Sequence, residues 1–268
     1  AHARSRAVRV IGVGAAIALL TACGSSANPH AGHNMGAQPG ASSSPTSQPP
    51  SISGGTELDA VLSPQIANMA FQDQSGKTVH LADFKGKSIV IQDSMTLCQE
   101  QCPIDTATFV AMARQYGSTA KNPADTVFLT ITVDPERDTP AQLAAYRNLY
   151  APGANELPGW QLLTGSVSDI TALWKYFHVY WEKVHSHEDV KNWRTGEKLT
   201  YDVLHGDEVF FIDKALQQRY LLDGMPSLGG AIPSKIEHFM SAEGMQNMKK
   251  QNWTVADGIK AVTWVNSL

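Results

Sequence analysis

From about residue 57 onward, short apolar runs alternate with longer stretches that carry one apolar and one polar face. The runs 87–92 and 126–133 are rich in β-branched residues, which is typical of strands buried on both faces. Between them, Pro103 suits the first position of a helix, where its missing N–H is not needed, and Gly117 suits the end of that helix. Strands that alternate with helices predict an α/β sheet with helices on both faces.

The same pattern predicts two β-hairpins, at 71–81 and 208–222. A further helix is expected after Thr139, because Thr139, Pro140 and Gln142 offer an N-cap, a first-turn proline and the last member of a capping box. That helix is expected to run to Leu149. The remaining expected elements are a strand at 160–163 and helices at 167–177, 233–250 and 255–265.

The N-terminus lacks this alternation. Three arginines precede the apolar run 10–20, which ends in Leu20-Thr21-Ala22-Cys23. This layout is that of a secretory signal peptide, and the run is too short to span a bilayer. The tetrapeptide resembles a bacterial lipobox, a signal in which the cysteine becomes the lipidated first residue. We therefore expect a signal peptide at 1–23 and a lipid anchor on Cys23.

Residues 24–56 consist mainly of Ser, Pro, Gly, Ala and Asn. Such a composition cannot bury enough apolar surface to offset its ordering entropy, so a disordered tether is expected before a folded domain at 57–268. Within the tether, His30, His33 and Met35 are copper-compatible side chains. They are either incidental to a linker or a metal-loading cluster.

Charge narrows the possible functions. The chain has 21 basic and 25 acidic residues and a formal net charge of −4. It therefore has no broad basic field of the kind that attracts nucleic acid, and we expect no nucleic-acid partner.

Cys98 and Cys102 are the only cysteines after Cys23, and they lie between a predicted strand and a predicted helix. A helix N-terminus favours thiolate over thiol. Thiolates favour Cu(I), zinc and iron–sulfur centres, while two neighbouring thiols can equally form a disulfide, which persists in an exported protein. The spacing alone leaves both possibilities open.

A third metal ligand is sought among the nine histidines, because two sulfurs are a thin coordination set. His205 directly precedes the predicted strand at 208–212, although a histidine in such a place is usually a loop residue. His185 and His187 lie in a polar insertion, which is either a solvated loop or a copper-docking surface. Met95 is either a core residue or an additional soft contact for the metal.

Three signals together resemble the Sco/SenC family of copper chaperones, from about Pro64 to the C-terminal helix. They are the CxxxC-Pro at 98–103, the run Thr-Val-Asp-Pro-Glu-Arg-Asp-Thr-Pro at 132–140, and a single histidine before a downstream hairpin strand. The resemblance implies a thioredoxin-like α/β fold, with a central mixed sheet flanked by helices and an N-terminal hairpin extension. It also implies that Cys98, Cys102 and His205 bind copper.

The chain departs from the family pattern near these ligands. Asp93, Ser94 and Met95 stand where the family usually has an aromatic-Gly-aromatic lead into the first cysteine. Gln99 replaces the usual proline, and Gly206 replaces the common serine. None of these changes removes a ligand, but they bear on the partner and on the metal preference.

Asp134 and Arg137 lie near the carboxyl end of a predicted parallel strand, where α/β sheets place their sites. We interpret both mainly as supports for the loops around the metal. A catalytic carboxylate is the alternative.

The resemblance implies a membrane-anchored, extracytoplasmic copper chaperone rather than an enzyme. Its partner would be the copper-binding subunit of cytochrome c oxidase, with its dinuclear copper site, or another copper protein. The alternative is a thiol-disulfide oxidoreductase that keeps the oxidase cysteines reduced, which needs Cys98 and Cys102 but not His205. A thioredoxin-like peroxidase, suggested by Thr96 and Leu97 before the first cysteine, is a third hypothesis.

Overall fold

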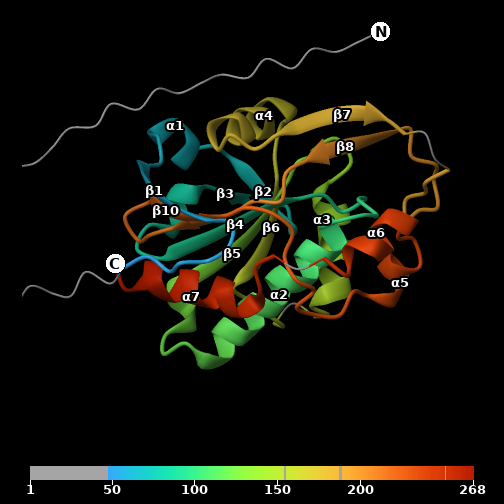
Figure 1. Cartoon of the computed structure of the whole chain (residues 1–268). Coiled ribbons are helices and arrows are strands. Elements are labelled where there is room, and N and C mark those ends of the chain that lie inside the picture. The colour runs from blue at the N-terminus through green and yellow to red at the C-terminus, as the bar shows by residue number, and fades with distance from the viewer. Residues whose placement is uncertain (1–47, 154, 187–188, 251) are drawn as a thin grey trace, which may run out of the picture. The chain divides into compact units, whose positions relative to one another are not determined.

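An eight-stranded mixed sheet forms the centre of the computed structural model, which describes residues 48–153, 155–186, 189–250 and 252–268 (Figure 1). Its strands are β1 (Gly55–Val61), β2 (Phe71–Asp73), β3 (Thr78–Val79), β4 (Ser88–Ser94), β5 (Thr126–Thr132), β6 (Trp160–Thr164), β9 (Val209–Ile212) and β10 (Gln217–Leu222). They lie in the order β1-β10-β9-β4-β5-β6-β2-β3. A separate antiparallel ribbon consists of β7 (Trp181–His185) and β8 (Tyr201–His205).

Four adjacent strands, β10, β9, β4 and β5, have the thioredoxin-like arrangement. β4 and β5 are parallel and are joined by the helix α2 (Cys102–Thr119). β9 pairs antiparallel with β4, β10 pairs antiparallel with β9, and the helix α7 (Val255–Asn266) follows. The expected fold class, a thioredoxin-like α/β fold with a central mixed sheet flanked by helices, is therefore confirmed. The expected N-terminal hairpin is also present, as β2 and β3, and β2 joins the sheet through β6.

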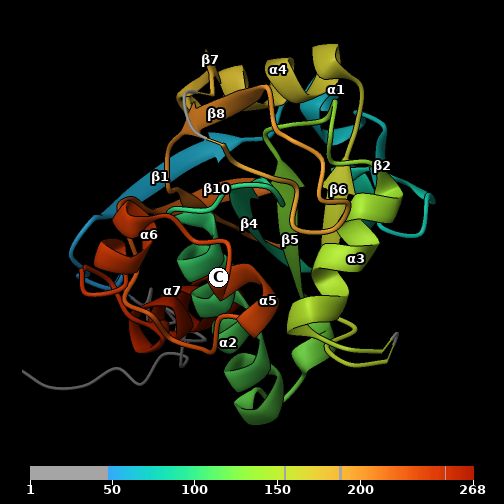
Figure 2. The same cartoon turned by 90° about the vertical axis from the view of Figure 1, so that its right-hand side faces the viewer.

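Helices cover both faces of the sheet, so that two apolar cores result (Figures 1 and 2). The helices α2, α7 and α3 (Pro140–Tyr150) pack on one face. The helices α1 (Pro64–Ala67) and α4 (Val167–Tyr176) pack on the other, where the β7–β8 ribbon also lies. Successive residues of a strand point to opposite faces. Val90 of β4 accordingly joins the first core, while Ile89 and Ile91 join the second.

Three expectations about helix ends are wrong. The helix α2 begins at Cys102, one residue before Pro103, and it continues through Gly117 because Gly117 keeps a helical conformation. Thr139 does cap α3 by accepting a hydrogen bond from the backbone N–H of Gln142. The Gln142 side chain does not complete the capping box, however, because its Oε1 accepts from Arg194 Nε and the Thr139 backbone N–H donates to the carbonyl oxygen of Arg137 instead.

The continuous helix expected at 233–250 is also wrong. Two short helices, α5 (Ser234–Glu237) and α6 (Ala242–Asn247), stand in its place. The chain breaks between them because Ser241 adopts an extended conformation and accepts a hydrogen bond from the N–H of Gly244, which starts a new helix. This break brings the start of α6 against the loop that carries the cysteines, as described below.

The expected signal peptide with Cys23 and most of the expected tether, including His30, His33 and Met35, lie outside the described residues. The described residues belong to one unit that spans 44–268. Among them, no helix is both long enough and apolar enough to cross a membrane.

Candidate metal centre

The strand β4 delivers the chain to the cysteine loop, residues 95–101. All seven residues of β4 are buried, and the loop that follows ends at the first turn of α2. Cys98 lies in the loop and Cys102 is the first residue of the helix. Because of this spacing, the backbone N–H of Cys102 points at Cys98 Sγ, with an N to S distance of 3.3 Å. Both cysteines are free thiols, with 9% and 1% of their surface exposed.

His205 approaches the cysteines from the end of β8. Its Nε2 lies 3.1 Å from Cys102 Sγ, although the two residues are 103 positions apart in the sequence. The structure thus brings the three expected ligands to one place. Across the part of the chain that the structure describes, no three His, Cys, Asp or Glu side chains form a ready-made metal cage. The two thiols and the imidazole are therefore adjacent, but they do not form a closed coordination sphere.

Two oxygen atoms hold the other side of the imidazole ring. Nδ1 lies 2.6 Å from Asp93 Oδ2 and 2.7 Å from the carbonyl oxygen of Gly206. From the sequence, Asp93 was only a departure from the family pattern, with no role assigned. One signal was available, since this carboxylate directly follows the run 87–92 that is predicted as a buried strand, and burying a charge is costly unless it is paired.

Burial and hydrogen bonding separate the two thiols. The hydrogen bond from Cys102 lowers the pKa of Cys98, with the positive charge of His205 adding to it, although burial opposes both. Burial raises the pKa of Cys102, and the hydrogen bond and charge of Cys98 raise it further. Cys98 is therefore the thiol that ionises first.

The histidine is held in a charged state. Burial alone would lower the pKa of His205, but the hydrogen bond to Asp93 and the charges of Asp93 and Cys98 outweigh it and raise the pKa to about 10. Near neutral pH the metal-free site thus contains an imidazolium next to a thiol that ionises readily. A metal that binds Nε2 must displace a proton from the ring.

Further carboxylates surround the ring. Asp105 on α2 accepts a hydrogen bond from Gln101 Nε2 at 2.6 Å, and burial raises its pKa. Burial also raises the pKa of Asp207, and that of Glu208 to about 8. Burial therefore favours the neutral, protonated form of these three carboxyl groups beside the ring.

Asp134 and Arg137 contact Tyr201, the first residue of the strand β8 that ends at His205. Arg137 forms an ion pair with Asp134 and donates from Nη1 to the carbonyl oxygen of Tyr201 at 2.7 Å. The Tyr201 hydroxyl donates to Asp134 Oδ1 at 2.9 Å, and the Arg137 guanidinium lies 3.7 Å from the centre of the Tyr201 ring. These contacts tie the first residue of β8 to the loop after β5.

Two segments cover the cysteine loop. From the connection between β7 and β8, the buried Trp193 donates from Nε1 to the carbonyl oxygen of Thr96 at 2.7 Å. From the other side, the N–H of Ser241 donates to the carbonyl oxygen of Gln99 at 2.9 Å. Gly244 of α6 lies so close that a Cβ there would be 2.6 Å from the same oxygen.

The other soft or imidazole side chains near the site lie as follows. Met95 is buried in the same apolar cluster as the two cysteines. His185 ends β7 and is exposed, and His187 lies outside the described residues.

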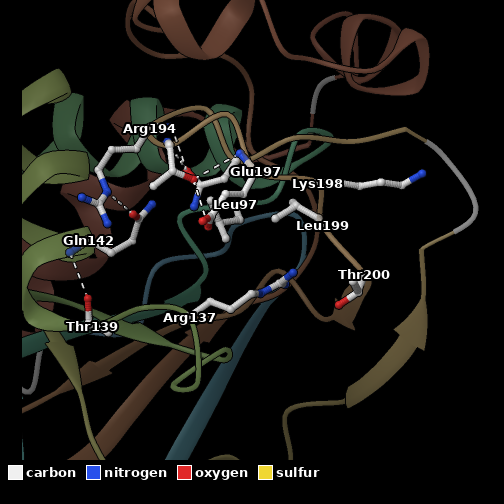
Figure 3. A pocket seen from close by; sticks show the side chains of 11 residues that line it. Leu97, Arg137, Thr139, Gln142, Arg194, Glu197, Lys198, Leu199 and Thr200 are labelled. Atoms are coloured by element: carbon white, nitrogen blue, oxygen red, sulfur yellow. Dashed lines mark hydrogen bonds between the residues drawn. The ribbon is translucent and has the colours of Figure 1, made fainter.

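A pocket of about 270 Å³ opens beside Leu97, next to the first cysteine (Figure 3). Two of its lining residues are Arg137 and Arg194. Figure 3 shows that their guanidinium groups point apart, that of Arg194 toward Gln142. The two cations therefore do not converge on a common anion.

Comparison with known proteins gives a consistent match. The family model described as SCO1/SenC matches residues 63–240. "Protein SCO2 homolog, mitochondrial" from Bos taurus is 33% identical over 118 residues, which cover 44% of this chain and 41% of that protein. "SCO1 protein homolog" from Bacillus subtilis (strain 168) is 30% identical over 112 residues, which cover 42% of this chain and 55% of that protein. The chain thus matches about half the length of these curated relatives.

Solved structures show the same similarity. A SCO1/SenC family lipoprotein from Bacillus anthracis str. Ames is 25% identical, with a TM-score of 0.49 over 69% of this chain and 95% of that one. ScoI from Bradyrhizobium japonicum, solved with copper bound, is 21% identical, with a TM-score of 0.44 over 69% of this chain and 99% of that one.

Proposed function

Because the chain belongs to the SCO1/SenC family, we propose that it binds copper through Cys98, Cys102 and His205 and passes the ion to another protein. The observation that carries this proposal is the convergence of the His205 imidazole on the CxxxC pair, with Nε2 3.1 Å from Cys102 Sγ. Thiol–disulfide exchange needs only the two sulfurs, although the positive charge of His205 also lowers the pKa of Cys98. In this role copper is the cargo of the protein and not a resident cofactor.

The donor set suits copper. Thiolate is a soft ligand that favours Cu(I), and imidazole binds copper in either oxidation state. Two donors that each lie about 2.0–2.3 Å from one ion are roughly 3–4 Å from each other. The observed distance between Cys102 Sγ and His205 Nε2 is in that range, so these two donors can bind one ion without a large movement.

Release requires that the site open. The two cysteines are almost fully buried beneath Trp193 and the start of α6, which keeps water away from the ion. Ligand exchange with a partner would proceed through Cys98, the more exposed of the two thiols. The site can accept copper only while both cysteines are reduced, because a disulfide removes two of the three donors.

We propose that the recipient is the copper-binding subunit of cytochrome c oxidase or another copper protein, as the resemblance to the Sco/SenC family implies. We also propose an extracytoplasmic location with a lipid anchor on Cys23, which the lipobox-like run Leu20-Thr21-Ala22-Cys23 supports. Mass spectrometry of the mature N-terminus tests the anchor. An unmodified Cys23, or a Cys23→Ser protein that stays with the membrane, would contradict it.

Asp134 and Arg137 are proposed as supports of the site. Their contacts with Tyr201 fix the first residue of β8, and His205 is the last residue of that strand. Replacing Arg137 by Gln is expected to weaken copper binding without removing any ligand.

Copper stoichiometry in single variants tests the proposed function. The Cys98→Ser, Cys102→Ser and His205→Ala proteins should each bind less copper than the wild type or release it more readily to a chelator. His80→Ala is the matched control, since His80 is a surface histidine that contacts Asp83. Full copper retention with unchanged spectra in the His205→Ala protein would refute the three-ligand site.

A second function, reduction of a partner's disulfide, is favoured by one observation. Cys98 has a lowered pKa, and the adjacent thiol of Cys102 can resolve a mixed disulfide. This function needs the two cysteines as electron donors but does not need a copper ligand. If the His205→Ala protein still supports assembly of the partner, reduction is the role. If assembly and copper binding are lost while the variant still reduces a model disulfide at the wild-type rate, copper delivery is the role.

A further inference from the structure

We propose that Asp93 is a positioning residue that holds the His205 ring with Nε2 open toward the cysteines, so that only this nitrogen is offered to copper. The inference rests on the copper-binding function proposed above and extends it to a residue that never touches the ion. It is carried by the hydrogen bonds around a single imidazole ring.

Both neighbours of Nδ1 are acceptors. Nδ1 lies 2.6 Å from Asp93 Oδ2 and 2.7 Å from the carbonyl oxygen of Gly206. An ionised carboxylate and a carbonyl have no hydrogen to donate, so the hydrogen between them belongs to Nδ1. Nε2, which faces Cys102 Sγ, is then the only ring nitrogen whose lone pair a metal can take.

Asp93 is itself fixed on both sides. It lies on β4, paired with Ile131 of the neighbouring strand, and its side chain is fully buried. Oδ2 binds the His205 ring, and Oδ1 accepts a hydrogen bond from the backbone N–H of Glu208 at 3.1 Å. The carboxylate thus holds the ring and the backbone three residues after it. The ring cannot turn without breaking buried hydrogen bonds.

The same strand also positions both parts of the proposed site. Asp93 lies on the strand that leads directly into the cysteine loop, so β4 positions the cysteines and the carboxylate that orients the histidine. A carboxylate bonded to the far nitrogen of a metal-ligating histidine fixes the ring and makes the ligand more basic, and its loss typically costs about 10–100-fold in metal affinity.

Asp93→Asn is the test variant. Asparagine keeps the shape of the side chain, but it has a single acceptor oxygen for the two N–H groups that Asp93 accepts, so one of them faces an NH₂ group. Asp213→Asn is the matched control, since Asp213 is a buried carboxylate that accepts hydrogen bonds from the backbone N–H groups of Ala215 and Gln217. It follows β9 at the opposite end of the sheet from the His205 ring.

Two readouts are needed. In the reduced, metal-free wild type, proton NMR should show a far-downfield resonance from the His205 Nδ1–H, assigned by its absence in His205→Ala. The Asp93→Asn protein should lack this resonance and should bind Cu(I) about 10–100-fold more weakly in competition with a chromophoric chelator. The Asp213→Asn protein should keep the resonance and bind Cu(I) as the wild type does.

The proposal is overturned if Asp93→Asn keeps both the resonance and the wild-type affinity. It is also overturned, without any variant, if ¹⁵N shifts of the Cu(I)-loaded wild type place the metal on Nδ1 and the proton on Nε2. A wild type that binds no copper would refute the proposed function instead, while the Nδ1–H resonance would still decide whether Asp93 holds the ring.

Discussion

Trp193 and Thr96 are 97 residues apart in the sequence and are joined by a hydrogen bond from the indole Nε1 to the backbone carbonyl, at 2.7 Å. The carbonyl lies two residues before Cys98. One side chain from the β7–β8 connection therefore holds the loop that carries the first cysteine, and the indole covers that loop in the core. Loss of this hydrogen bond should therefore both destabilise the fold and make the cysteines more accessible.

Trp193→Phe should loosen the cysteine loop. The substitution removes the N–H donor but keeps most of the apolar contact, and it leaves the Thr96 carbonyl without that donor. The free energy of unfolding should fall by about 1–3 kcal/mol, and Cys98 should react faster with iodoacetamide. Trp253→Phe is the control, because Trp253 is also buried and donates to the carbonyl oxygen of Gly224, outside the loop. Equal acceleration of alkylation in both variants would contradict the account.

The two thiols should differ in reactivity. Cys98 has the lowered pKa and the larger exposure, while burial raises the pKa of Cys102. Near neutral pH, alkylation followed by mass spectrometry should therefore modify Cys98 at least about 10-fold faster than Cys102, since the thiolate is the nucleophile. The comparison is made in the Cys98→Ser and Cys102→Ser proteins as well as in the wild type. Faster modification of Cys102 would show that the assignment is reversed.

A glycine pair tests how closely α6 covers the site. A Cβ at Gly244 would lie 2.6 Å from the Gln99 carbonyl oxygen and 2.9 Å from that of Glu100, both of which are backbone atoms. Gly244→Ala should therefore cost about 1–3 kcal/mol of stability through overpacking. Gly117→Ala, in α2, meets no atom within 4 Å and should be neutral or stabilise the protein by up to about 1 kcal/mol. Denaturant unfolding measures both. An equal loss of stability in the two variants would mean that α6 does not pack closely against the cysteine loop.

Asp138 should make stability depend on pH. Its carboxylate accepts hydrogen bonds from Thr96 and Thr132, and burial raises its pKa from 3.8 to about 7. The folded state therefore holds a proton that the unfolded chain releases above about pH 4. The contribution of Asp138 to the free energy of unfolding is thus complete below about pH 4 and is lost as the pH rises to about 7. The loss is at most about 1.4 kcal/mol per pH unit.

Asp138→Asn removes this titratable group. The free energy of unfolding of the wild type minus that of the variant should decrease steadily from about pH 4 to about pH 7 and then stay constant. Urea unfolding at several pH values measures it. A difference that is constant, or that grows with pH, would show that Asp138 is ionised throughout in the folded protein.

The sequence was sufficient to predict the elements that carry a strong periodic signal. The β-branched runs that became β4 and β5 can be buried on both faces only in the middle of a sheet, and these strands are central and parallel. The edge strand β1 was missed because most of its residues are exposed and show no clear alternation. The ribbon strands β7 and β8 were missed for a related reason, since a long polar connection rather than a tight turn joins them.

The candidate site was predictable only in part. Cys98 and Cys102 follow from their spacing at a helix start, and His205 was singled out by the family resemblance. The role of Asp93 could not be predicted in this way, because its partner is 112 residues away and on a strand that the sequence analysis did not predict. The cover by Trp193 and α6 depends equally on tertiary packing, which a single sequence does not encode in any local pattern.

X-ray absorption spectroscopy of the Cu(I)-loaded protein tests the central claim most directly. The account predicts two sulfur neighbours at about 2.3 Å and one nitrogen at about 2.0 Å from copper, with the nitrogen lost in His205→Ala and one sulfur lost in each Cys→Ser variant. A copper environment without nitrogen in the wild type, or a spectrum that His205→Ala leaves unchanged, would contradict it.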